Sequence, residues 1–183
     1  MPETLYLVPV GEVDGQILDH LCRELEETFG SGCMVAAPLA HPHPAYNENR
    51  EQYLSSYILQ QLAQLELAHA FRVLGVADLD LYVPELDFVF GQAAKGGRDA
   101  VIALPRLRQS FYGLEDDEKV FRERVVKEAI HELGHTFGLD HCPNKGCVMH
   151  FSNSLADTNF KGQHFCARCR SHLDGGRCQI TLL

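Results

Sequence analysis

The chain has 183 residues, of which 45% are hydrophobic and 22% are charged. This composition is typical of a soluble globular protein, and the length suits one domain with a sizeable core. The net charge of -9, with scattered Lys and Arg residues, argues against nucleic acid as the main partner. No run approaches membrane-spanning length, and the N-terminus lacks the features of a signal peptide. We therefore expect a cytoplasmic protein without a membrane partner, monomeric by default.

Predicted strands and helices alternate in the first part of the chain. Apolar and β-forming residues predict a buried strand from Thr4 to Val10. Apolar residues at four-residue spacing predict an amphipathic helix from Val13 to Phe29, which Gly30 ends. The next predicted elements are a short strand over 33–39, a proline-rich loop over 41–47, a helix over 50–68 and a strand over 71–76.

The second part of the chain is predicted to complete the sheet and to end in a long helix. The region 78–84 is ambiguous between loop and strand. It precedes a strand over 88–91, a turn over 94–97, a strand over 100–104, a mobile loop over 106–117 and a helix over 118–137. The order β-α-β-α-β-β-β-α predicts an α+β fold, in which helices pack on a mixed, mainly parallel twisted sheet. No linker divides the chain, so residues 1–183 are expected to form a single domain.

The sequence from His131 to His141 reads as HExxHxxGxxH. Residues four apart share a face of a helix, so His131 and His135 would project side by side toward one metal ion. Gly138 lets the chain leave the helix sharply, and the turn can bring His141 back as a third ligand. Three imidazoles and one water are a common ligand set for catalytic zinc. The alternative is a helix end whose histidines cap carbonyl groups or are half buried.

Glu132 lies beside the two helical histidines and is the predicted catalytic residue. Zinc lowers the pKa of a water that it binds from about 15.7 toward about 7. In this prediction Glu132 accepts the proton of that water, which attacks a peptide carbonyl, and then returns a proton to the leaving amine. The predicted activity is therefore hydrolysis of peptides or proteins.

Two pairs of cysteines follow the histidine motif. Cys142 and Cys147 precede the CxxC motif of Cys166 and Cys169 by about twenty residues, a spacing that fits a closed tetrahedral zinc site. Redox or disulfide pairing is the alternative. Since consecutive side chains tend to point apart, His141 and Cys142 would serve different metals. The sequence thus predicts two Zn²⁺ ions per chain, with residues 142–183 as a zinc-stabilised subregion.

These motifs together resemble the archaemetzincins, a branch of the metzincin zinc peptidases. The resemblance rests on HELGHTFGLDHC, on Cys147-Val148-Met149 and on the later CxxC, with support from DLDLYVP (78–84) and FVFG (88–91). It implies a compact mixed sheet and the same two zinc sites. It also implies that Met149 forms a turn beneath the catalytic zinc, a residue that would otherwise be interpreted as core filler.

The resemblance further implies that an edge strand before the catalytic helix binds extended substrate by β-pairing. The segment from Phe88 to Ala94 is the best candidate, unless a loop covers this edge. The loop over 106–117 would restrict access if it packs over the cleft. Its aromatic residues Phe111 and Tyr112 would then either line a substrate pocket or pack on the surface.

The remaining histidines and cysteines receive no functional role. A solvated, hydrogen-bonded or surface position is expected for His41, His43, His150, His164 and His172. The expected roles of the cysteines are buried core for Cys22 and Cys33 and a free thiol for Cys178. The sequence leaves one functional alternative, a two-zinc scaffold with little hydrolytic activity, against which the intact Glu132 argues.

Overall fold

The computed structural model describes residues 3–180, and the side chains of residues 3–175. A five-stranded sheet has the strand order β2-β1-β5-β8-β7. The strands are β1 (Thr4–Val10), β2 (Gly32–Val35), β5 (Ala70–Ala77), β7 (Gly91–Ala93) and β8 (Asp99–Ala103). All neighbours pair in parallel except β7, which is antiparallel to β8 at the edge of the sheet. The predicted mixed, mainly parallel sheet is therefore confirmed.

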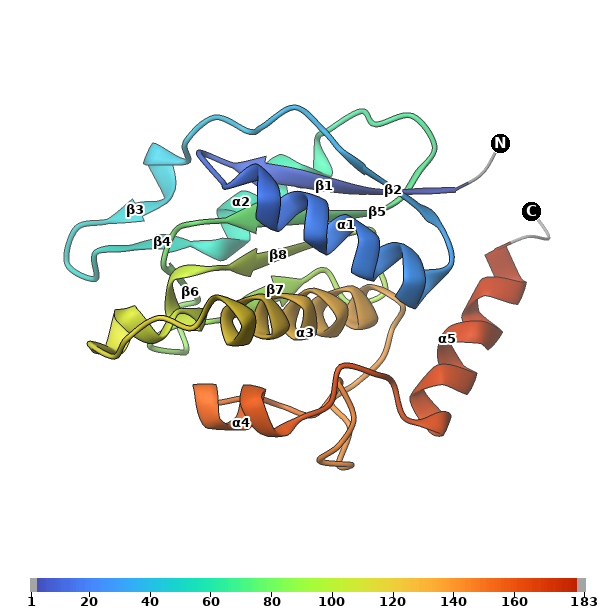
Figure 1. Ribbon diagram of the computed structural model, residues 1–183. Helices are drawn as coiled ribbons and strands as arrows, with labels where there is room; N and C mark the ends of the chain where they lie inside the picture. The colour runs from blue at the N-terminus through green and yellow to red at the C-terminus, as the bar shows by residue number, and fades with distance from the viewer. Residues whose placement is uncertain (1–2, 181–183) are drawn as a thin grey trace.

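Helices cover both faces of this sheet (Figure 1). Helices α1 (Gly15–Phe29) and α3 (Glu118–Thr136) pack on one face, and α2 (Ser55–Ala63) packs on the other. Strand β1 serves both layers because its side chains alternate: Leu5 and Leu7 face α1 and α3, while Val8 and Val10 face α2. The core is thus two apolar layers with the sheet between them. Across the part of the chain that the structure describes, helices of membrane-spanning length and apolarity are absent.

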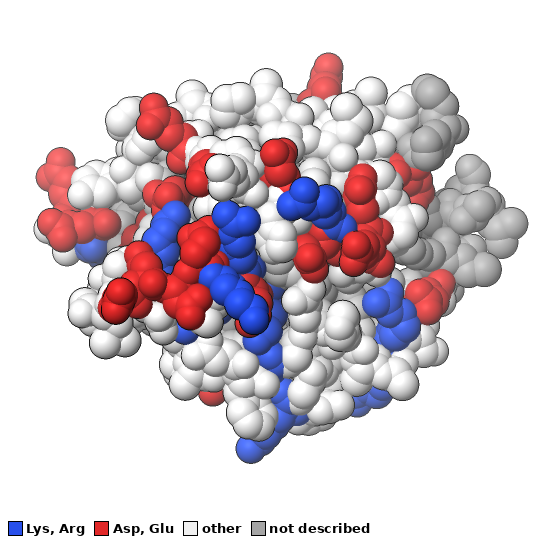
Figure 2. Space-filling model, in the orientation of Figure 1, with Lys and Arg blue, Asp and Glu red and all other residues white. Residues whose placement is uncertain are grey.

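Helix α1 has the ends that its sequence predicts. The Asp14 side chain accepts a hydrogen bond of 2.9 Å from the backbone N–H of Gln16, and Gly30 takes a left-handed φ of 64° after the last turn. The outer faces of α1 and α3 carry intermingled acidic and basic side chains (Figure 2). Among them, Arg122 and Glu118 form an ion pair across one turn of α3.

The predicted helix over 50–68 is wrong at both ends, because α2 covers only Ser55–Ala63. Residues before it form the strands β3 (Tyr46–Asn47) and β4 (Gln52–Leu54), and β4 also pairs with β6 (Leu81–Tyr82) in a three-stranded sheet. Gln52 is buried and donates hydrogen bonds to the Asp80 carboxylate and to the Asp87 carbonyl. These contacts with a distant segment override the local helical pattern.

Other predicted boundaries also shift. The strand predicted over 88–91 is found at Gly91–Ala93, and the strand predicted over 33–39 ends at Val35. The loop over 106–117 contains two 3-10 helices, η2 (Pro105–Leu107) and η3 (Gln109–Tyr112), and a third, η1 (His43–Ala45), lies in the proline-rich loop. The cysteine-containing tail forms α4 (Leu155–Phe160) and α5 (Ala167–Ile180), which the sequence analysis did not predict.

The expectation that Cys22 and Cys33 are separate core thiols is also wrong. They form a disulfide that joins α1 to β2, and both are only partly buried where they pack against the core. Their separation of 11 residues carries no recognisable pairing signal. It is the turn at Gly30 that returns the chain alongside the helix. The Cys178 side chain lies outside the described residues.

Phe29 links this scaffold to the C-terminal part of the chain. Its ring is fully buried, stacks on Phe137 at a centroid distance of 5.6 Å and meets the edge of Phe165 at 6.0 Å. Phe137 directly follows α3, and Phe165 precedes α5. One side chain of α1 thus supports both the turn after α3 and the segment before the CxxC motif.

The substitution Phe29→Ala should lower the free energy of unfolding by about 3–5 kcal/mol, because it removes a buried ring and leaves a cavity. Denaturant unfolding measures this change. The control is Phe160→Ala: this ring is 71% exposed, so the change should stay within about 0.5 kcal/mol. Equal losses in the two variants would contradict the central place of Phe29.

Candidate active site and metal centres

The last turns of α3 carry His131, Glu132 and His135. The helix begins where the Asp117 side chain accepts a hydrogen bond from the backbone N–H of Val120. It ends at Thr136, and Gly138 then takes a left-handed φ of 85° with its N–H bonded to the His135 carbonyl at 2.9 Å. This sharp exit brings His141 back toward the helix, as the sequence predicts.

The three imidazoles converge as a metal site requires. Nδ1 of His131 lies 2.8 Å from the Val148 carbonyl oxygen, and Nδ1 of His135 lies 2.7 Å from that of Leu139. Since a carbonyl can only accept, both Nδ1 atoms carry the proton, and each Nε2 presents a lone pair. The two Nε2 atoms lie 3.1 Å apart, and a ring nitrogen of His141 is within 4.8 Å of both. A cation would satisfy these facing lone pairs, so the donor set fits zinc.

Burial keeps these histidines in their neutral form. Desolvation is the main cause that lowers the pKa of all three, and it places the pKa of His131 well below the usual value. Neutral imidazole is also the form that binds a metal. The protein therefore holds the three rings ready for coordination at neutral pH.

Met149 packs against α3 at Gly134, the residue before His135. It is fully buried, and its sulfur packs so closely against Gly134 that a side chain there would collide with it. Its carbonyl accepts a hydrogen bond of 2.8 Å from the backbone N–H of Cys142. The Met149 backbone thus supports the segment that carries His141 and Cys142.

The four predicted cysteines gather into a second cluster beside the first. One ligand atom from each of Cys142, Cys147, Cys166 and Cys169 lies within 4.8 Å of the others. The sulfurs of Cys142 and Cys166 are 3.8 Å apart, and zinc–sulfur bonds of about 2.3 Å in a tetrahedron require nearly that separation. A hydrogen bond from the Cys169 N–H, at the start of α5, lowers the pKa of Cys166 to about 7. The cluster therefore fits a closed four-thiolate site.

The other histidines near these clusters have separate environments. Nδ1 of His150 lies 2.9 Å from the Cys142 carbonyl oxygen, which gives His150 a hydrogen-bonding role. His164 and His172 are exposed. His41 and His43 are also exposed and lie with their rings together at a centroid distance of 4.3 Å.

A cleft of about 290 Å³ opens over the histidine cluster. The edge segment predicted to bind substrate forms one wall, through residues 88–92, and Phe151 lies at the other side against the His141 ring. Among the described residues, this wall includes none of 106–117. Phe111 instead lies behind the wall, where the Arg106 guanidinium sits between its ring and that of Phe88. The loop thus braces the cleft from behind.

Glu132 lines the same cleft and is buried. Desolvation is the main cause that raises its pKa to about 8; the nearby Glu128 carboxylate acts in the same direction and Lys161 in the opposite one. A cation held by the adjacent imidazoles would favour the ionised carboxylate. The group can therefore exchange a proton near neutral pH.

Comparisons with known proteins agree with this geometry. The sequence profile of Peptidase family M54 matches residues 31–175. The archaemetzincin of Pyrococcus furiosus is 42% identical over 95% of this chain and 94% of its own length. That of Methanocaldococcus jannaschii is 44% identical over the same shares.

This chain belongs to the archaemetzincin family. It is a zinc metallopeptidase, and its substrates are peptides or proteins. The crystal structure of the archaemetzincin from Methanopyrus kandleri superposes with a TM-score of 0.86 at 39% identity, covering 97% of this chain and 96% of that one. The archaemetzincin of Archaeoglobus fulgidus, solved in complex with malonate, gives 0.81 at 37% identity, covering 92% and 99%.

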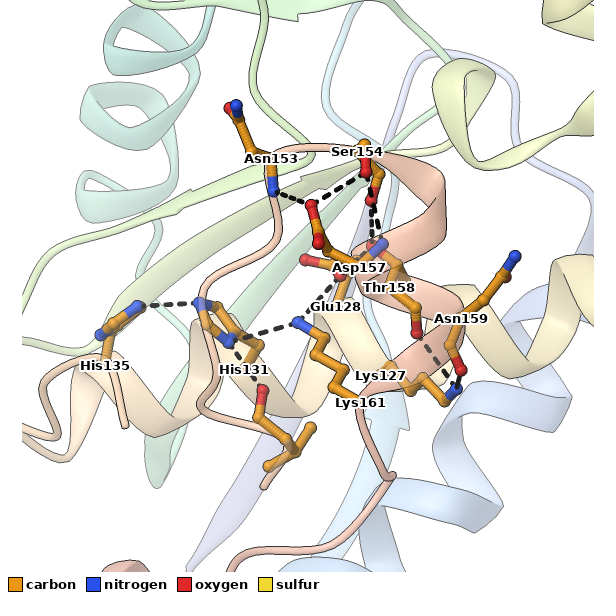
Figure 3. A network of polar contacts seen from close by, with 11 residues as sticks. Lys127, Glu128, His131, His135, Asn153, Ser154, Asp157, Thr158, Asn159 and Lys161 are labelled. Atoms are coloured by element: carbon orange, nitrogen blue, oxygen red, sulfur yellow. Dashed lines mark hydrogen bonds and ion pairs between the residues drawn. The ribbon is translucent and has the colours of Figure 1, made fainter. Parts of the chain in front are cut away.

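A buried network ties the tail of this archaemetzincin to the catalytic helix (Figure 3). The Lys161 ammonium forms an ion pair of 3.0 Å with Glu128, and both side chains are almost fully buried. The Thr158 hydroxyl donates to the same Glu128 oxygen at 3.1 Å. The Lys161 nitrogen also lies 3.4 Å from Nδ1 of His131. Two residues of the tail therefore meet α3 directly beside a candidate ligand.

Sequence analysis missed both partners of this pair. Glu128 lies one helical turn before Glu132 and lines the same cleft, so its spacing from the motif was a usable signal. Lys161 had no such signal. It directly follows the short helix α4, and its burial depends on contacts 30 or more residues away in sequence.

Lys161→Met should lower the free energy of unfolding by about 3–5 kcal/mol, because the Glu128 carboxylate is left buried without its partner. Denaturant unfolding of the zinc-loaded protein measures this loss. Lys119→Met, on the exposed face of α3, should change the value by at most about 0.5 kcal/mol. The double variant Glu128→Gln with Lys161→Met should recover much of the loss. A loss in the single variant no larger than that of Lys119→Met would contradict the importance of the pair.

Proposed function

We propose that this chain hydrolyses peptide bonds with zinc on His131, His135 and His141, and with Glu132 as general base and acid. The observation that carries this proposal is the convergence of three neutral imidazoles beside a buried carboxylate in one cleft. When bound, zinc supplies Lewis acidity toward a water molecule and the substrate carbonyl oxygen.

In this proposal the Glu132 carboxylate moves the protons. It accepts one from the attacking water and delivers it to the leaving nitrogen as the carbon–nitrogen bond breaks, so that a neutral amine departs. Burial raises the pKa of Glu132, which supports the form that delivers a proton, and a cation bound beside it would favour the ionised form that accepts one. The hydrogen bonds at Nδ1 of His131 and His135 hold the two rings so that Nε2 faces the cleft.

We further propose that substrate binds along β7 as an additional strand. Among residues 3–180, β7 pairs in the sheet with β8 alone, which leaves its outer edge available beside Glu132. The apolar residues Phe88 and Val89 line the cleft just before this edge and can contact substrate side chains.

The second proposed zinc binds Cys142, Cys147, Cys166 and Cys169 and has a structural role. Residues 1–183 would then form one catalytic domain, with 142–183 as its zinc-stabilised part and Met149 as the turn beneath the catalytic zinc. The contacts of Phe29 with Phe137 and Phe165 support a single domain, because they join α1 to the segments that follow α3 and precede α5. The location in the cytoplasm and the monomeric state stay predictions. The two-zinc scaffold stays the alternative that activity measurements must exclude.

Glu132→Gln should lower kcat/KM on a peptide library by about 10²–10⁴-fold, because the amide cannot accept the proton from water. Zinc content should not change, since Glu132 is not among the proposed ligands. The control is Glu123→Gln, which alters an exposed carboxylate on the same helix and should keep full activity. Full activity in Glu132→Gln would disprove the assigned role. No turnover by the native protein with two zincs bound would favour the scaffold.

The native chain should contain two zincs, measured by elemental analysis. Cys169→Ser should reduce this to about one, because a buried thiolate ligand is lost from the closed site. His172→Ala should keep both, although His172 lies close in sequence to the same cluster. A single zinc in the native protein would contradict the four-cysteine assignment.

A further inference from the structure

Gly91, the first residue of β7, lies directly against the Glu132 side chain. A Cβ atom placed on Gly91 would lie 2.5 Å from Cγ and 2.9 Å from Cδ of Glu132, and 2.8 Å from the Val101 carbonyl oxygen. All three distances are shorter than real Cβ contacts. The Glu132 side chain therefore occupies the space that any other residue at position 91 would fill.

Backbone conformation does not explain this glycine. Gly91 does not have a positive φ, and it pairs with Ile102 in regular antiparallel register. Glycine inside a strand weakens the strand, and it is used where another group approaches the backbone closely. At Gly91 the approaching group is the carboxyl side chain of the catalytic helix.

The surroundings leave little freedom to relieve a collision at this position. Beyond the strand, the Gly96 N–H donates a hydrogen bond of 3.0 Å to the His135 carbonyl, and Lys95 pairs with Asp140. These contacts hold β7 and the end of α3 together. On the opposite face of β7, the Ser55 hydroxyl donates to the Gln92 side chain at 2.6 Å. A Cβ atom at Gly91 would therefore shift β7 slightly against the Val101 carbonyl, and it would displace the Glu132 side chain, whose Cγ lies closest to it and which α3 cannot move away.

We propose that Gly91 is a positioning residue for Glu132: its missing side chain lets the carboxyl group lie against the edge strand and face the cleft. This inference rests on the proposed catalytic role of Glu132. It assigns to the substrate-binding edge a second task, that of setting where the proton acceptor lies. In this proposal the position of the general base depends on the edge strand that packs against it.

The test is Gly91→Ala in the zinc-loaded protein, with kcat, KM, zinc content and melting temperature measured on a peptide that the native enzyme cleaves. We expect kcat to fall about 100-fold, as a displacement of about 1 Å of a catalytic group produces. Zinc content should stay close to the native value, since the histidines are unchanged, and KM should change much less than kcat, since the shift of β7 is small. A kcat within threefold of native would overturn the proposal.

Two glycine variants separate positioning from loss of stability. Gly75→Ala places a methyl group 2.8 Å from Leu62 Cδ1 on the other face of the sheet, so it should lower the melting temperature and leave kcat nearly unchanged. Gly32→Ala meets nothing within 4 Å and should be neutral in both measurements. If kcat in Gly75→Ala falls as far as in Gly91→Ala, the loss reflects general strain and the proposal fails.

A double variant tests whether Gly91 acts through Glu132. Adding Gly91→Ala to Glu132→Gln should lower the residual kcat by less than threefold, because the general base is already lost. A full 100-fold further loss would overturn the proposal. A crystal structure of Gly91→Ala gives a readout that does not depend on turnover: the Glu132 carboxyl group should be displaced from its native position. If the native protein has no peptidase activity, the proposed function fails, while this structure still decides whether Gly91 positions Glu132.

Discussion

The hydrogen bond between Nδ1 of His131 and the Val148 carbonyl is the contact on which both candidate metal centres depend. It fixes the tautomer and orientation of His131, so that Nε2 faces His135 across the cleft. The acceptor belongs to the residue between Cys147, in the four-cysteine cluster, and Met149, which packs against Gly134 of α3. Val148 is itself held by a hydrogen bond of 3.0 Å from its N–H to the His164 carbonyl, two residues before Cys166. The backbone of the cysteine cluster thus orients a histidine of the catalytic helix.

A second contact between the C-terminal part of the chain and α3 is an ion pair. Lys161 and Glu128 are buried together beside His131, and burial of a lysine is tolerated only where a carboxylate compensates it. Thr158 adds a hydrogen bond to that carboxylate from α4. Between them, the Val148 carbonyl and the Lys161 ammonium flank Nδ1 of His131 from two parts of the tail. The catalytic helix is therefore only half of the site, since His131 takes its orientation from Val148 and His135 from Leu139, both beyond the end of the helix.

Sequence analysis predicted those features of the site that depend on local geometry. His131, Glu132 and His135 follow from helical spacing, His141 from the glycine exit, and the cysteine cluster from its two pairs. Sequence analysis did not find Gly91, Glu128 and Lys161, because their roles depend on distances between segments that only the folded chain brings together. The same reason explains α2, whose predicted first turn became strand β4 when Gln52 found partners near Asp80 and Asp87. The disulfide between Cys22 and Cys33 was likewise set by the turn at Gly30.

The loop over 106–117 shows how a sequence-based expectation changes once its neighbours are known. The sequence predicted a mobile loop that would restrict access only if it packed over the cleft. In the structure Arg106 makes a two-point contact with Asp80, at 2.6 and 2.9 Å, and lies between the rings of Phe88 and Phe111. Asp80 also accepts from Gln52, which anchors the small sheet. The wall that carries Phe88 is therefore supported from behind by charge, stacking and backbone pairing at once. Opening this wall would break the contacts of Arg106 with Asp80, Phe88 and Phe111 together, so these contacts favour one fixed arrangement of Phe88 and its neighbours beside the cleft.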